Sequence, residues 1–454
     1  CNEYAGLLMT TPLPPAASPR LAALRHRDFF LVWAGEFISV TGSQMQLFAI
    51  NWHVFQLLRG QTVTVSVFGG SAALGADALG LGLLGLARIL PIILFALVGG
   101  MLADSRDRRQ LMVWTRLLAA GLAGLLALLT LTGQASIGLI YLITALAAGV
   151  TAFDSPARQS LVPNLVPREH LANAVSLNSL MWQLATIIGP ALAGVLIGAR
   201  TAADASADPA AATAPIGVIY ALNAISFGAA VAALALIRYR GQARNGGGVG
   251  WGPLVEGLRF TFRSPVIRGT MLLDFFATFF SSANTMLPII TTEVLGLGAA
   301  GYGLLATAQP LGAVLAGMTV ALRREIQRQG AVLLASVAVY GLATVMFGLS
   351  TQFVLSYLFF ALTGAADTVS TVIRGTVRQL NTPDHLRGRM TSVNMMFFMG
   401  GPQLGELEAG LVASAFGAPV AIITGGLATL AIAGWVAWKN VTLRRYTSAA
   451  AAAD

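Results

Sequence analysis

The chain has 454 residues, of which 56% are hydrophobic and only 10% are charged, and its formal net charge is +9. A soluble domain carries about a quarter charged residues, so this composition excludes a soluble globular protein and predicts an all-α membrane protein. Basic chains can bind nucleic acid, but the basic residues here are distributed as in a membrane protein, so no nucleic-acid partner is expected.

Residues 1–28 are expected to be a cytoplasmic N-terminal tail. The first twenty are rich in Pro and Ala and contain no apolar signal region, which predicts disorder and no cleavable signal peptide. Cys1 is the single cysteine, so no disulfide framework is expected. Both a native and a lipid-modified Cys1 are compatible with the sequence.

Twelve apolar segments follow, each close to the 20 residues or so that cross a bilayer as a helix. Their expected positions are 29–56, 78–102, 110–132, 136–160, 171–199, 215–237, 266–295, 301–322, 330–349, 352–378, 387–415 and 418–438. A linker at 238–265 separates an N-terminal six-helix bundle (29–237) from a C-terminal six-helix bundle (266–438), and a cytoplasmic tail occupies 439–454. Within the linker, Pro253–Phe262 is predicted to be a short helix on the membrane surface.

The basic residues predict the orientation. If both termini are cytoplasmic, all 28 except Arg59, Arg88, Arg116 and Arg200 fall in cytoplasmic segments or at their edges. The positive-inside rule therefore favours cytoplasmic termini and a multi-pass protein of the bacterial inner membrane.

A short charged loop connects the second and third segments. The pattern Gly100-x-Leu102-Ala103-Asp104-x-x-x-Arg108-Arg109 resembles the signature loop of the major facilitator superfamily. Ser105 and Asp107 depart from the usual form, which has a basic residue and a Gly there. The resemblance implies two six-helix bundles that switch conformation, with Asp104 holding the start of the eleventh helix, where the helix dipole favours an anion.

A second motif lies in the fifth segment. Gly189-Pro190-x-x-x-Gly194 resembles the antiporter motif of proton-coupled exporters in this superfamily. Pro190 removes one helix hydrogen bond, and the glycines allow close approach of a neighbouring helix; ordinary small-residue packing is the alternative interpretation. The runs Asp154–Ser179 and Gly401–Gly410 are similar to the branch that contains enterobactin and macrolide exporters.

The two halves also repeat weakly. Asp154, Pro167 and Gly194 have counterparts in Asp367, Pro383 and Gly410, and the separation from the proline to the last glycine is the same in both sets. Parallel repeats of this kind are typical of the two halves of a major facilitator.

Ionisable residues inside a membrane are functional candidates because burying them is costly. For proton coupling we select Glu36, Arg88, Asp274 and Glu408. Arg88 lies near the middle of the second segment and is predicted to pair with Glu36; a permanent structural bridge is the alternative. Glu406 and Glu408 are two residues apart and face nearly opposite ways on a helix, so only one of them, with Glu408 preferred, is expected to face a central cavity.

Charged residues near the predicted cytoplasmic side are interpreted as gates. Asp154 and Arg158 have the i,i+4 spacing of a helical ion pair. Asp367 and Arg374, together with Arg378, form the matching cluster in the other half.

Polar and aromatic residues of the segments are candidates for a substrate cavity, although each could equally connect helices. The set comprises Gln44, Asn51, Trp182, Gln183, Asn284, Gln309, Asn394 and Phe398.

The functional prediction is a secondary active transporter that exports a small amphipathic compound, a drug or siderophore, in exchange for protons. It is expected to work as a monomer and without a cofactor. The sequence has no phosphate-binding loop, no metal-ligand pattern and no nucleophile–base pattern of an enzyme. A proton-coupled nutrient importer and a non-transporting membrane receptor are the alternatives.

Overall fold

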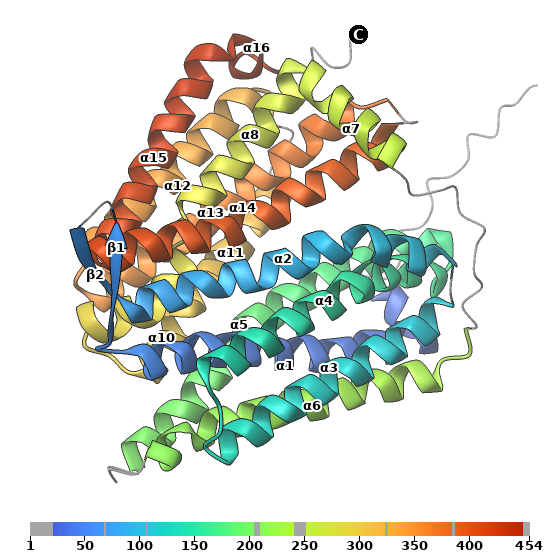
Figure 1. Ribbon diagram of the computed structural model, residues 1–454. Helices are drawn as coiled ribbons and strands as arrows, with labels where there is room; N and C mark the ends of the chain where they lie inside the picture. Colours follow the sequence, from blue (N-terminus) through green and yellow to red (C-terminus); the bar gives the residue numbers. More distant parts are fainter. Residues whose placement is uncertain are drawn as a thin grey trace, which may run out of the picture.

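The computed structural model describes residues 21–67, 70–105, 107–203, 209–239, 251–322, 326–383 and 386–447. Cys1 and the centre of the predicted linker therefore lie outside the described residues. Each of the twelve predicted segments is helical (Figure 1). The first six are α1 (Arg27–Leu58), α2 (Ala76–Ser105), α3 (Arg108–Leu131), α4 (Ile137–Leu161), α5 (Leu171–Ala203) and α6 (Pro209–Leu236).

The second six segments include two that are not single helices. They comprise α8 (Pro265–Phe280) with α9 (Leu287–Ile289), α10 (Ala299–Ala306) with α11 (Ala308–Leu322), α12 (Gln329–Leu349), α13 (Phe353–Leu380), α14 (Arg387–Phe416) and α15 (Ala418–Lys439). The short helices α7 (Trp251–Arg263) and α16 (Val441–Arg444) and the turns η1 (Ala22–Arg25), η2 (Val162–Asn164) and η3 (Arg168–His170) lie outside these segments.

The seventh segment was predicted as one helix over 266–295, and this is wrong. After α8 the chain forms a 3-10 turn, η4 (Ala283–Met286), then α9 and a π-helical turn, η5 (Ile290–Val294). Pro288 lies in the first turn of α9. A proline has no N–H to donate to the preceding turn, so it begins a helix readily and interrupts a longer one.

The composition of the helices fits a membrane protein. Ten helical stretches of the described residues are long and apolar enough to cross a membrane. α1 and α14, with 32 and 30 residues, are as long but more polar. They complete the twelve, and their polar side chains include Glu36, Asn51 and Glu406 of the candidate site below.

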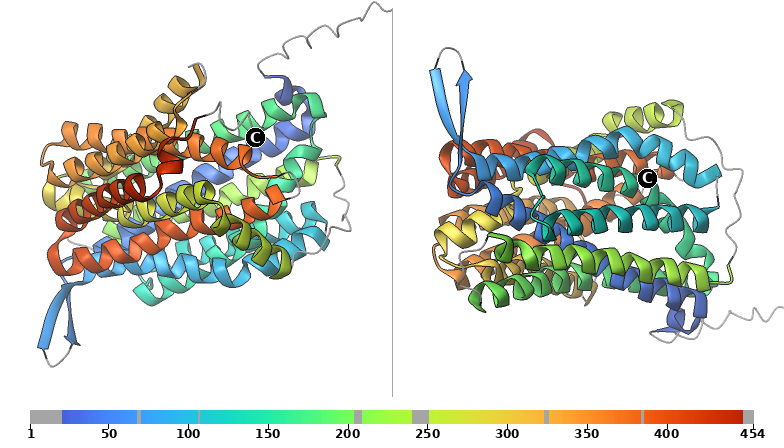
Figure 2. Two further views of the ribbon diagram at one scale, coloured as in Figure 1. Left: turned by 90° about the horizontal axis from the view of Figure 1, so that it is seen from above. Right: turned by 60° about the horizontal axis from the view of Figure 1, so that its bottom comes forward.

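A two-stranded antiparallel hairpin follows α1, where no element was predicted. Strands β1 (Thr62–Val67) and β2 (Gly70–Gly75) pair with Thr62 opposite Gly75 and Val67 opposite Gly70. The hairpin extends beyond the helix ends (Figure 2). Its sequence signal is the alternation Thr-Val-Thr-Val-Ser-Val, which is typical of a strand.

The helices form two bundles, α1–α6 and α8–α15, which converge at the hairpin end and diverge at the opposite end (Figure 1). At the hairpin end, a single hydrophobic core contains residues of both bundles, among them Phe55, Leu84, Met286 and Ala413. The other cores among the described residues each belong to one half. The two bundles are therefore packed together at the hairpin end and lie apart at the opposite end.

The predicted surface helix is confirmed as a helix, α7. It packs against α8 and α14, and Glu256 of α7 forms an ion pair with Arg389 of α14. The phenyl ring of Phe262 also contacts that of Phe397 at a centroid distance of 6.4 Å.

Candidate functional site

The two bundles meet through glycines on two pairs of helices. A Cβ on Gly194 of α5 would lie 2.6 Å from the Cα of Gly303 on α10, and one on Gly82 of α2 would lie 2.8 Å from the Cα of Gly410 on α14. Real Cβ atoms do not approach other atoms this closely, so only glycine permits both contacts. Gly194 and Gly410 are the residues that end the two matching repeats of the sequence.

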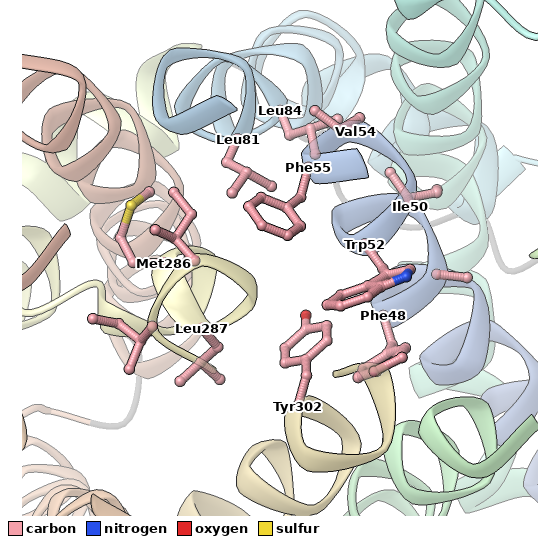
Figure 3. Packing of buried hydrophobic residues seen from close by; sticks show 14 of the residues in the cluster. Phe48, Ile50, Trp52, Val54, Phe55, Leu81, Leu84, Met286, Leu287 and Tyr302 are labelled. Atoms are coloured by element: carbon pink, nitrogen blue, oxygen red, sulfur yellow. The ribbon is translucent and has the colours of Figure 1, made fainter. Parts of the chain in front are cut away.

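Aromatic side chains from both bundles pack together at Tyr302, which precedes Gly303 in the chain (Figure 3). The ring of Tyr302 from α10 stacks on Phe48 of α1 at 4.0 Å between centroids, and Trp52 lies 5.9 Å from Tyr302. All three side chains are buried. They close the hairpin end of the molecule with residues from both bundles, and no sequence motif had indicated them.

An ion pair joins the bundles near the middle of α2. Nη1 of Arg88 lies 3.2 Å from Oε2 of Glu406 on α14, and Nη2 donates to Oδ1 of Asn51 at 3.0 Å. Both charged side chains are 13–15% exposed. The prediction that Arg88 pairs with Glu36 is therefore wrong: α2 faces α14 across the glycine contact, and this brings Glu406 to the arginine.

Glu36 belongs to a network inside the N-terminal bundle. Nη2 of Arg116 on α3 lies 2.9 Å from Glu36 and 2.9 Å from Oδ2 of Asp154 on α4, and Nη1 donates to Ser39 at 3.1 Å. Thr115 donates to Oδ1 of Asp154 at 3.0 Å. Arg116 competes successfully for Glu36 because it sits between both carboxylates, and burial makes its two ion pairs strong.

Arg158 completes this network. Its Nε lies 3.8 Å from Oδ2 of Asp154, at the predicted i,i+4 spacing, and its guanidinium lies 4.8 Å from the centroid of the Trp182 ring. Two carboxylates and two guanidinium groups thus balance one another, which satisfies the rule that buried charges are paired. Trp182 holds Arg158 through a cation–π contact, and its place in a substrate cavity stays a prediction.

The C-terminal bundle contains an equivalent network. Arg374 of α13 lies 2.9 Å from Asp274 of α8 and 3.4 Å from Asp367. Arg378 lies 3.8 Å from Asp274 and donates to Asn394 of α14. The predicted cluster of Asp367 and Arg374 is present, and Asp274, selected separately for proton coupling, is part of it.

The two networks occupy matching places. Glu36 is the tenth residue of α1 and Asp274 is the tenth residue of α8. Each pairs with an arginine from another helix of its own bundle, and each arginine also contacts an aspartate of the fourth helix, Asp154 or Asp367. Each bundle therefore holds its own balanced set of charges toward the end opposite the hairpin. We call this the arginine-rich end, because α3 begins there with Arg108 and Arg109, and Arg378 of α13 and Arg389 of α14 lie near it.

The charged loop is described in part. Gly100 and Asp104 lie in the last turns of α2, but their side chains are outside the described residues, so the predicted contact of Asp104 with the eleventh helix remains a prediction. Asp107 caps α3 by accepting from the backbone of Arg109 at 2.8 Å. Arg109 donates to the carbonyls of Leu234 and Ala235 at the end of α6, and Arg108 begins α3.

The antiporter-like motif contacts both bundles. A Cβ on Gly189 would lie 2.5 Å from Cβ of Gln44 on α1, within the N-terminal bundle. Pro190 lies inside α5, and one turn later Gly194 contacts the other bundle. Through Gly189 and Gly194, α5 therefore packs closely against α1 of its own bundle and against α10 of the other bundle.

The remaining cavity candidates fall in different places. Asn284 donates to Gln309 at 2.8 Å within the C-terminal half, and Phe398 is 50% exposed. Gln183 is partly buried on α5. Glu408 makes no ion pair or hydrogen bond within the described part of the chain, whereas Glu406 meets Arg88. Asn51, next to Arg88, is the candidate that the structure brings to the contact between the bundles.

Comparisons with known proteins agree with this geometry. The family of transmembrane secretion effectors, a group of major facilitator transporters, matches residues 18–454. The chain belongs to this family. It is therefore a multi-pass membrane protein with the two-bundle fold of secondary transporters.

Individual transporters and solved structures are also similar to this chain. An enterobactin exporter of Salmonella typhimurium is 26% identical over 377 residues, which cover 81% of each chain. One from Escherichia coli is 27% identical over the same share. A bacterial homologue of the human lysosomal transporter Spinster, in an inward-facing and occupied conformation, has a TM-score of 0.69 at 14% identity and covers 93% of this chain and 99% of its own. A bacterial homologue of ferroportin, in an inward-facing state, has a TM-score of 0.66 at 14% identity.

Proposed function

We propose that this secretion effector exports a siderophore-like amphipathic compound from the cytoplasm across the bacterial inner membrane, as a monomer, in exchange for protons. The relatives of similar length named above are enterobactin exporters. Alternating access moves such a compound when the contact at the hairpin end opens and the arginine-rich end closes.

The observation that carries the proposal is the ion pair between Arg88 and Glu406. It connects the two bundles, so it must separate when they part at the hairpin end. Proton binding by Glu406 removes one charge of the pair and lowers the cost of separation. Arg88 is then available to an anionic oxygen of the transported compound, while Phe48, Trp52 and Tyr302 offer aromatic surface beside it.

The two networks within the bundles have a different role in this proposal. Because Glu36 and Asp274 are each paired inside one bundle, bundle separation does not break their ion pairs. We assign Asp154, Arg158, Asp367 and Arg374 to gates at the arginine-rich end and the charged loop to the conformational switch. Proton coupling centres on Glu406 with Arg88.

Transport in proteoliposomes tests the proposal. The purified protein is reconstituted, and uptake of a labelled catecholate siderophore is measured with the lumen acidic, with the lumen alkaline, and without a gradient. An antiporter accumulates the compound when the lumen is acidic, because protons leave as it enters. Accumulation with an acidic exterior would instead identify a proton-coupled importer, and no gradient-dependent transport across a panel of siderophores and hydrophobic drugs would contradict the proposed function.

A further inference from the structure

A groove opens on the outer wall of the N-terminal bundle, between α2, α3 and α4. It has a volume of about 340 Å³ and is lined almost entirely by apolar side chains, among them Pro91, Phe95, Leu118 and Phe153. Volumes of this size are within the range of ligand pockets. Its lining residues all come from the N-terminal bundle and include none of the residues that meet the C-terminal half, so it is separate from the contact between bundles described above.

The surroundings of the groove are hydrocarbon. Ile93, Leu94 and Leu146 are all more than half exposed beside it, and the three helices are long and apolar enough to cross a membrane. In a membrane-embedded transporter, the medium that contacts such a surface is the acyl chains of lipids.

Trp114 fixes the depth of the groove in the bilayer. This residue lines the groove and is 70% exposed, six positions after the start of α3. Tryptophans favour the boundary between head groups and acyl chains. At 1.5 Å per residue, Trp114 lies about 9 Å along α3 from its first residue, so the rim of the groove lies near the level where acyl chains begin.

The floor of the groove reaches the charge network of the bundle. Thr115 lines the groove with its neighbours and its hydroxyl donates to Asp154, which in turn contacts Arg116. A hydrocarbon chain in the groove would therefore cover the network from the membrane side and keep water from these paired charges.

From these features we propose that the groove binds one acyl chain of a phospholipid of the leaflet at the arginine-rich end, with Trp114 at the rim and Thr115 at the floor. The lipid is a resident of the N-terminal bundle and is not transported. The site rests on the membrane location of the chain and does not depend on the identity of the exported compound.

Gly149 of α4 provides the test. A Cβ there would contact Phe95 at 3.4 Å and Pro91 at 3.7 Å, so a Leu side chain fits the backbone and fills the groove. Gly228 of α6 is the matched control, since it is exposed and a Cβ there meets nothing within 4 Å. The probe is phosphatidylglycerol with a photoactivatable group in one acyl chain, added to the full-length protein in nanodiscs, and the adducts are mapped by mass spectrometry.

The proposal predicts adducts concentrated on Phe95, Trp114 and Phe153. Gly149→Leu should reduce them by about tenfold, the loss expected when about two methylene groups no longer find an apolar site, and Gly228→Leu should leave them unchanged. Phe95→Ala enlarges the groove and should increase labelling of Trp114 and Phe153. Equal labelling of the exposed residues of α3, α4 and α6 in all variants would overturn the proposal, as would protection of the groove by the siderophore or by a second copy of the chain but not by unlabelled phosphatidylglycerol.

Discussion

Gly410 on α14 lies against Gly82 on α2 so closely that a Cβ on Gly410 would be 2.5 Å from the Cα of its partner. The contact exists only while the hairpin end is closed. Gly410→Val should therefore disfavour this conformer by the cost of overpacking, about 1–3 kcal/mol, which corresponds to a shift of about 5–150-fold between states.

A single cysteine at Leu305, fully buried in the shared core, reports the shift when Cys1 is replaced. Its labelling rate should increase in Gly410→Val and in Gly194→Val. Gly228→Val, at an open position on α6, should not change it. Identical rates in all variants would show that the glycine contacts do not limit opening.

The central ion pair gives a prediction about energy coupling. Glu406→Gln should abolish transport driven by a pH gradient while substrate binding and gradient-independent exchange remain, because a neutral amide cannot carry a proton through the cycle. Glu36→Gln and Asp274→Asn should retain gradient-driven transport in molecules that fold. If Glu406→Gln retains gradient-driven transport and either Glu36→Gln or Asp274→Asn loses it, the proton is carried by the charge network inside one bundle and not by Glu406.

Arg116 should matter more for stability than for coupling. Its loss leaves Glu36 and Asp154 buried without their shared partner, and breaking a buried ion pair costs about 3–5 kcal/mol. Arg116→Gln should therefore lower the thermal unfolding temperature clearly in detergent. Arg389→Gln breaks the partly exposed pair with Glu256, worth about 0–1 kcal/mol, and serves as the control; equal losses in both variants would contradict the assignment.

The orientation can be measured with two further cysteines. Ser66→Cys lies on the hairpin and Arg263→Cys on α7, at opposite ends of the molecule. An impermeant maleimide applied to intact cells should label the first and not the second, since the basic residues place α7 in the cytoplasm. The reverse pattern would invert the topology and the direction of export.

The charged loop is tested by Asp104→Asn. The signature of the superfamily predicts that this carboxylate favours one conformer, so the variant should fold normally but transport more slowly, by about 5–150-fold if the shift between states is 1–3 kcal/mol. Wild-type rates would show that the loop acts only as a topology signal.

The order of the helices could be predicted from the sequence because each span is a local feature: apolar length, flanking arginines and the loop motif determine it. The breaks before Pro288 and between α10 and α11 depend on where a new helix begins, which hydrophobicity alone does not report. The hairpin was not predicted because its six-residue strands are far shorter than the apolar segments that span a membrane.

The pairing of charges could not be predicted, for a geometric reason. The position of a residue along a helix indicates its depth in the membrane but not which helix its side chain faces. Glu36 and Arg88 were therefore predicted to pair without knowledge of the helices beside them. In the structure Arg116 occupies the space next to Glu36, and the close approach at Gly82 and Gly85 brings Glu406 to Arg88. The pair i,i+4 of Asp154 and Arg158, which is local, was predictable.

The confinement of each charge network to one bundle bears on how the chain is made. Glu36, Asp154, Arg116 and Arg158 all precede residue 200, so the first six helices can neutralise these buried charges while the second half is still being synthesised. Among the ion pairs of the described residues, the pair of Arg88 joins the first bundle to α14 and so must wait for that helix. The charge of Arg88 is therefore neutralised by Glu406 only when the second half has been inserted and α14 packs against α2.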